Sequence, residues 1–183
     1  MQPKKIAVLF SGNGTNLHYL LKHLPSKYEI VVTLCNNPNA KGIEISKSFD
    51  VECIVIDSKR YSSREEFDRD IILALEPYDV DLVVLAGFMR VLGEEFTSEF
   101  KAINLHPSLL PRHKGLKAIE KSYQDEHEEG GVSVHFVNSE LDGGEIILQK
   151  SIKKANLNFE EYDKFIREIE KEALVEAIEK VLG

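Results

Sequence analysis

Short apolar runs rich in β-branched residues alternate with segments of helical period in the first half of the chain. The runs predict buried strands over Ile6–Phe10, Ile30–Cys35, Cys53–Ile56 and Leu82–Ala86. The clearest helical segment is Arg64–Leu75, whose apolar residues recur every three or four positions. Strands and helices that alternate in this way form a parallel sheet with helices on both faces.

The second half predicts a different arrangement. A helical stretch over Leu116–Asp125 precedes an alternating apolar pattern over Gly131–Asn138 and another apolar run over Ile146–Ile152. The turn signal Leu141–Gly144 lies between these two runs, so they should form an antiparallel hairpin. Apolar residues in helical register predict an amphipathic helix over Phe159–Leu182. We therefore expect an α/β fold with a doubly wound, mostly parallel twisted sheet, Rossmann-like in its first half, an antiparallel C-terminal hairpin and a C-terminal helix.

Length and composition indicate one domain over residues 1–183. The net charge of −8 argues against a nucleic-acid backbone as the main ligand. The first apolar run is too short for a signal peptide or a membrane span. Cys35 and Cys53 show no Cys-x-x-Cys pairing, and we interpret both as buried thiols of a reducing compartment. These features favour a soluble cytoplasmic protein.

The segment Asn104–Pro111 carries the most informative chemistry. Asn104 and His106 are two residues apart at the end of an apolar run, so on a strand they face the same side. Pro107 then prevents a further ladder hydrogen bond and favours a turn. A carboxamide can donate to a developing oxyanion, and a histidine can hold charge or move a proton near neutral pH. The alternative is a structural strand-end histidine beside a turn asparagine.

A glycine-rich turn, Ser11–Leu17, follows the first predicted strand and leads into a helix. Unpaired amides at a helix N-terminus attract anions, so a phosphate is the expected guest. The turn lacks the third glycine of the dinucleotide fingerprint and the Gly-Lys-Ser/Thr of a Walker loop. In the alternative interpretation, Thr15 or Asn16 only caps the helix.

Asp142 admits two interpretations. With Gly143 it forms a common hairpin turn, whereas next to His106 its charge would favour the imidazolium form and raise the pKa of that histidine. Arg64 alone is a solvated charge at a helix start, and His135 is a second-tier candidate that faces either a cleft or solvent. The remaining histidines are expected to be surface or packing groups: His18, His23, His113 and His127. Nothing has metal-ligand spacing, and no Gly-x-Ser-x-Gly nucleophile elbow occurs.

Four motifs follow one another along the chain: Ser11–Asn16, Leu85–Leu92, Asn104–Pro111 and Val134–Val137 leading to Leu141–Gly144. In this order, and in a chain of this length, they resemble the folate-dependent formyltransferases. The resemblance covers almost the whole chain. It implies transfer of a formyl group from 10-formyltetrahydrofolate to the amine of glycinamide ribonucleotide, a step of de novo purine synthesis.

The resemblance also implies roles for individual residues. Asn104, His106 and Asp142 become the catalytic trio. The ribonucleotide contacts become Gly14, Thr15, Asn16 and Glu172. The folate contacts become Arg64, Met89, Arg90, Val91, Leu92, Asn104, Asn138, Ser139, Glu140 and Leu141. The implied partners are small molecules, with the formyl folate as co-substrate and neither a metal, a nucleic acid nor a membrane, and the implied assembly is a monomer or a homodimer.

The chain departs from the family at three places. Glu145 stands where the family often has proline, Ala173 replaces a common histidine, and the chain stops at Gly183 where many relatives continue. These departures bear on the ribonucleotide contacts of the last helix more than on the trio.

Three alternative functions remain. A formyltetrahydrofolate deformylase has the same trio with water as acceptor, but carries an additional N-terminal domain, whereas the first strand is expected at Ile6. A methionyl-tRNA formyltransferase has a longer chain with a basic tRNA-binding domain. A non-catalytic folate- or nucleotide-binding module would need the glycine-rich turn but not the trio.

Overall fold

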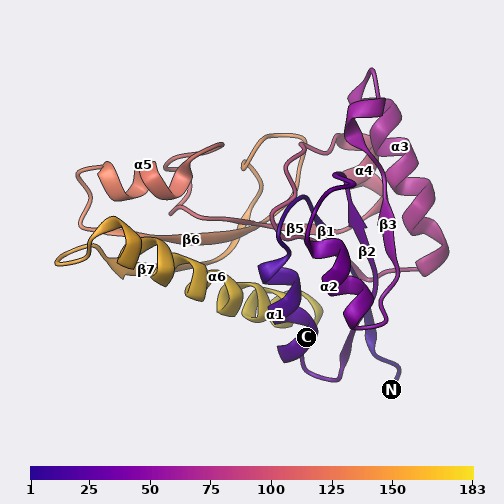
Figure 1. The fold of residues 1–183 in the computed structure, drawn as a ribbon, viewed down its shortest axis with the longest axis horizontal. Helices are drawn as coiled ribbons and strands as arrows, with labels where there is room; N and C mark the ends of the chain where they lie inside the picture. The colour runs from indigo at the N-terminus through magenta and orange to yellow at the C-terminus, as the bar shows by residue number, and fades with distance from the viewer.

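The computed structural model describes all residues, Met1–Gly183, and places seven strands in one twisted sheet (Figure 1). The strand order is β3-β2-β1-β4-β5-β6-β7. The first five strands are parallel, and β6 pairs antiparallel with both β5 and β7. The strands are β1 Lys4–Phe10, β2 Tyr28–Cys35, β3 Cys53–Val55, β4 Leu82–Leu85, β5 Ala102–His106, β6 Glu129–Phe136 and β7 Ile146–Lys153. The expected doubly wound sheet with its terminal hairpin is confirmed.

Six α-helices and two short 3-10 helices complete the fold. The α-helices are α1 Thr15–His23, α2 Gly42–Ser48, α3 Arg64–Leu75, α4 Glu94–Glu99, α5 Ala118–Gln124 and α6 Phe159–Leu182. The 3-10 helices are Ser58–Arg60 and Glu76–Tyr78. The bounds predicted for α3 and α6 are confirmed, and α5 begins at Ala118 rather than at Leu116.

Successive side chains of β1 point to opposite faces of the sheet, and the core forms one layer on each face. Ile6 and Val8 face α1, α5 and α6, where the buried residues include Leu17 and Leu174. Ala7 and Leu9 face α3 and α4 on the other side of the sheet (Figure 1). Because successive side chains of a strand point to opposite faces, a run that is apolar at every position requires helices on both sides.

The antiparallel pairing of β5 and β6 decides which side chains meet near the end of β5. Asn104 lies opposite His135, and His106 lies opposite Ser133. The register of β6 against β7 shifts between Val134 and His135, as a β-bulge does. The pairing of β5 with β6 places His135 beside the end of β5, next to the Asn104 and His106 pair.

The two cysteines are both free, but they differ in exposure. Cys35 is buried at the end of β2, as expected. Cys53 is only half-buried, because β3 is an edge strand of the sheet; the prediction of two buried thiols is therefore wrong for Cys53. None of the helices combines the length and apolarity that a membrane span needs.

Candidate active site

A cavity of about 560 Å³ opens at the carboxyl ends of β4 and β5. Its volume is in the range of small-molecule sites. The strand order reverses between β1 and β4, and ligands of doubly wound sheets bind at such a switch point. The walls come from the segment after β4, the end of β5, the start of α5, the segment after β6, one side chain of α1 and two side chains of α6.

The structure brings the predicted catalytic trio together in the wall of this cavity. His106 and Asp142 are buried, with 6% and 8% of their surface exposed. Asp142 Oδ2 lies 3.4 Å from Nδ1 of His106, and Asp142 Oδ1 accepts a hydrogen bond from Nδ2 of Asn104 at 3.4 Å. Asp142 also has a positive φ of 50° before Gly143, so it lies in a turn and beside His106 at the same time.

The second nitrogen of His106 also faces an oxygen of the protein. Nε2 donates to the backbone carbonyl of His113 at 2.7 Å. A carbonyl and a carboxylate only accept, so both contacts of the ring are satisfied together when both nitrogens carry protons.

His135 faces the cleft and not solvent. Its Nδ1 donates to the backbone carbonyl of Phe136 at 2.8 Å. Its Nε2 lies 3.2 Å from Nδ2 of Asn104 and 3.7 Å from Oδ1 of Asp142. A neutral ring accepts from the Asn104 amide, whereas a cationic ring donates to the Asp142 carboxylate. In either state His135 fixes the orientation of a residue of the trio.

The surroundings of Asp142 keep its carboxyl ionised. Burial alone would raise its pKa, but contacts from the His135 ring and the Gly115 N–H, together with the charge of His106, lower the pKa below the usual aspartate range. The Gly115 N–H donates to Oδ2 at 2.9 Å. Asp142 is thus a fixed negative charge at the cavity wall.

The glycine-rich turn has the geometry of an open helix start. Gly14 precedes α1 with a positive φ of 71°, and no side chain caps the helix, so the capping alternative for Thr15 or Asn16 is not observed. A Cβ at Gly14 would lie 2.8 Å from the Cα of Gly42, so only glycine fits there. Asn16 lines the cavity, whereas Gly14 and Thr15 lie outside its wall.

A glutamate that the sequence analysis did not identify lies opposite Asn16. Glu170 of α6 is 5% exposed, lines the cavity and accepts a hydrogen bond from Nδ2 of Asn16 at 3.4 Å. Glu172, the residue carried over by resemblance, is exposed and lies outside the cavity wall, because it points away from the buried face of α6. The missed signal is that Glu170 interrupts the apolar stripe between Ile166 and Ala173.

Burial raises the pKa of Glu170, and the charge of Arg167 and the hydrogen bond from Asn16 oppose this only in part. A carboxyl with a raised folded-state pKa contributes stability below its unfolded pKa, which is lost as the pH rises through the folded pKa. We therefore expect the free energy of unfolding, measured by urea unfolding, to fall less in Glu170→Gln than in the wild type as the pH rises from 4 to 8. Glu172→Gln is the matched control. An unchanged pH dependence in Glu170→Gln would contradict the assigned burial.

Most of the implied folate contacts line the cavity. Those in its wall are Met89, Arg90, Val91, Leu92, Asn104, Asn138, Glu140 and Leu141. Ser139 and Arg64 are not part of the wall. Arg64 is exposed at the start of α3 and lies beside Gly93, at the end of the Met89–Leu92 segment. No group of three or more His, Cys, Asp or Glu side chains is arranged to hold a metal ion.

The chain is similar in sequence and in fold to proteins of one family. The family model described as formyl transferase matches residues 4–178. The phosphoribosylglycinamide formyltransferase of Escherichia coli (strain K12) is 39% identical over 152 residues, which covers 80% of this chain and 72% of that protein. That of Bacillus subtilis (strain 168) is 32% identical over 98% of this chain and 95% of its own length. The crystal structure of phosphoribosylglycinamide formyltransferase from Campylobacter jejuni has a TM-score of 0.95 and 47% identity, covering 100% of this chain and 99% of that one. The chain therefore belongs to the formyl transferase family.

Proposed function

We propose that the protein transfers the formyl group of 10-formyltetrahydrofolate to the amine of glycinamide ribonucleotide, giving formylglycinamide ribonucleotide and tetrahydrofolate in de novo purine synthesis. The observation that carries the proposal is the meeting of Asn104, His106 and Asp142 in the wall of one cavity. The names of the relatives in E. coli and B. subtilis, and of the C. jejuni structure, support formyl transfer to the ribonucleotide.

The trio suits direct transfer. The substrate amine attacks the formyl carbon, a C–N bond forms, and the carbonyl electron pair moves to oxygen. Asn104 and cationic His106 donate hydrogen bonds to this oxyanion, and one such donor contributes about 3–4 kcal/mol in the transition state. To reach it, Nε2 of His106 exchanges the His113 carbonyl for the oxyanion, since Nδ1 remains on Asp142.

Collapse of the tetrahedral intermediate restores the carbonyl and breaks the bond from the formyl carbon to the folate nitrogen. The amine must lose a proton and the departing nitrogen must gain one. Asp142 keeps His106 cationic and, through water, assists this proton movement. A protein nucleophile is not required in this scheme, so transfer proceeds without a covalent enzyme intermediate.

The ribonucleotide end of the cavity is assigned to the glycine-rich turn. The unpaired amides at the start of α1, with Gly14, Thr15 and Asn16, would hold the phosphate. Glu170 would contact the ribonucleotide in place of Glu172, because Glu170 lines the cavity beside Asn16.

The folate end of the cavity is assigned to the Met89–Leu92 and Asn138–Leu141 segments. Exposed apolar side chains gather at its mouth, where Met89, Leu116 and Leu141 are 63%, 69% and 52% exposed. Apolar residues exposed at a cavity mouth are typical of ligand-binding sites. Arg90 stacks over the ring of Phe67, 5.1 Å from its centroid, and Arg64 lies near the same segment. Both cations would meet an anionic tail of the folate.

An absorbance assay with 10-formyltetrahydrofolate, run with and without glycinamide ribonucleotide, tests the proposal. We expect formation of tetrahydrofolate that depends on the ribonucleotide. Turnover without the ribonucleotide would instead indicate the deformylase, in which water is the acceptor. Binding of both ligands without turnover would indicate a non-catalytic module.

A further inference from the structure

The backbone of the loop between β5 and α5 touches both buried members of the trio. The His113 carbonyl accepts the hydrogen bond from Nε2 of His106, and the Gly115 N–H donates to Asp142. Both contacts use main-chain atoms, so the path of the loop sets the positions of the two catalytic side chains. We call residues 107–117 the His113 loop.

Two residues of the His113 loop have an unfavourable backbone conformation. His113 and Lys117 have positive φ angles of 54° and 58°, in a region that residues other than glycine rarely adopt. Such a conformation persists where surrounding contacts hold it. The side chain of His113 contacts Asp125, a residue outside the loop.

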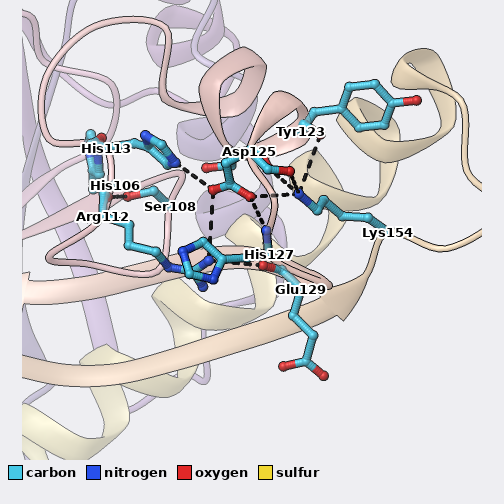
Figure 2. A network of polar contacts seen from close by, with 10 residues as sticks. His106, Ser108, Arg112, His113, Tyr123, Asp125, His127, Glu129 and Lys154 are labelled. Carbon is cyan, nitrogen blue, oxygen red and sulfur yellow. Dashed lines mark hydrogen bonds and ion pairs between the residues drawn. The ribbon is translucent and has the colours of Figure 1, made fainter.

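Asp125, at the C-terminal end of α5, contacts the ring of His113 (Figure 2). Its Oδ2 accepts from Nε2 of His113 at 2.6 Å, and its Oδ1 accepts from Nζ of Lys154 at 2.7 Å. The backbone N–H of His127 also donates to Oδ1, at 2.9 Å. The side chains of Lys154 and Asp125 are 10% and 15% exposed. This pair is therefore largely removed from solvent, where an ion pair is screened little.

The charges of the cluster agree with this role. Burial would raise the pKa of Asp125, but hydrogen bonds from Lys154 and His113 lower it well below the usual aspartate range. Lys154 also donates to the backbone carbonyls of Ser122 and Asp125, at 2.8 and 2.9 Å. The ammonium group has three hydrogens, and these contacts use all of them. Asp125 is thus fixed by α5 and by the segment after β7.

We propose that Asp125, held by Lys154, is a positioning residue that orients the His113 ring. It thereby keeps the Gly115 N–H on Asp142, and it keeps the His113 carbonyl on His106 until the oxyanion replaces that carbonyl. The inference rests on the proposed function, since it affects turnover only if His106 and Asp142 act on the substrates. No contact of Asp125 with substrate is required. Its action passes through the ring and the main chain of His113.

Substitution of His113 tests this without leaving Lys154 buried and unpaired. His113→Phe keeps an aromatic ring but removes the donor to Asp125, and His113→Gln keeps an amide that can donate. His127→Phe is the matched control, because the His127 ring is exposed and only its backbone touches Asp125. His113→Ala serves the same comparison should the phenylalanine variant fail to fold.

We expect His113→Phe to lower kcat by roughly 10- to 100-fold, the usual effect of a displaced catalytic group, while the KM of each substrate stays within about twofold. His113→Gln should recover most of kcat, and His127→Phe should match the wild type. A wild-type kcat in His113→Phe, or a change confined to KM, would overturn the inference.

A second measurement separates this inference from the proposed function. In ¹H–¹⁵N NMR spectra of the imidazole rings, the Nε2 proton of His106 should be protected from exchange in the wild type and in His127→Phe, and should lose protection in His113→Phe. This readout needs no substrate. Absence of wild-type turnover would contradict the proposed function alone, whereas an unchanged His106 resonance in His113→Phe would overturn the positioning role, whatever the activity.

Discussion

Replacing His106 with alanine is expected to lower kcat by about 10²- to 10³-fold, because it removes one donor to the oxyanion. The ring is buried between the His113 carbonyl and the Asp142 carboxylate, so no other side chain of the trio can take its place. Steady-state kinetics with saturating formyl folate and ribonucleotide would measure the loss. The KM values should change much less than kcat, because the lost hydrogen bond strengthens in the transition state.

Two further variants show whether the loss of kcat comes from the lost donor at His106. His106→Gln retains an amide donor without the positive charge, and we expect its kcat to lie between those of the wild type and His106→Ala. His23→Ala removes an exposed histidine at the end of α1 and should leave kcat unchanged. A His106→Ala variant with wild-type kcat would exclude the oxyanion role.

The long helices could be predicted from the sequence because their end signals are local. α3 follows Ser63, whose side chain accepts from the Glu66 N–H, and α6 follows Asn158, which forms a capping box with Glu161. The first two strands begin at Lys4 and Tyr28, earlier than the predicted starts at Ile6 and Ile30. The polar residues that precede them, such as Lys4 and Glu29, pair in the parallel ladder although their side chains face solvent.

The short helices could not be predicted in the same way. α2 and α4 span seven and six residues, too few for an apolar period to appear. Neither begins with a side-chain cap. Packing on the sheet forms them: a Cβ at Gly42 of α2 would overlap the ring of Phe10, and Phe96 of α4 is buried.

In the candidate site, too, the local relations between residues could be predicted, and those that depend on tertiary packing could not. Asn104 and His106 could be paired from their spacing on one strand, because that relation is local. The approach of Asp142 to His106 depends on β6 pairing antiparallel with β5, which returns the segment after β6 to the end of β5. The contact between Asn16 and Glu170 depends on how α6 packs beside α1. Relations of this kind arise from tertiary packing. The resemblance indicated Glu172, whereas the glutamate of α6 that lines the cavity is Glu170, two residues earlier.

Asp142→Asn is expected to lower kcat by about 10²- to 10⁴-fold while leaving the binding of the formyl folate largely intact. Asparagine keeps the shape of the side chain and an oxygen that can accept from the Gly115 N–H, so the turn should persist. It lacks the negative charge that lies beside Nδ1 of His106. Stopped-flow turnover and equilibrium binding of the folate would separate the two effects. Near-normal turnover would contradict the role assigned to Asp142.

The same variant should also change the dependence of stability on pH. The pKa of Asp142 is lowered in the folded protein, so its contribution to stability is present above the unfolded pKa of about 3.9 and is lost as the pH falls through the lower folded value. Asp142→Asn should therefore be less stable than the wild type at pH 7, by about 1–3 kcal/mol, the cost of losing hydrogen bonds to a charged group. Urea unfolding should show the difference shrinking below pH 4 as the wild-type carboxyl takes up a proton. A deficit of equal size at pH 7 and in acid would mean that packing, and not the charge of Asp142, accounts for the loss.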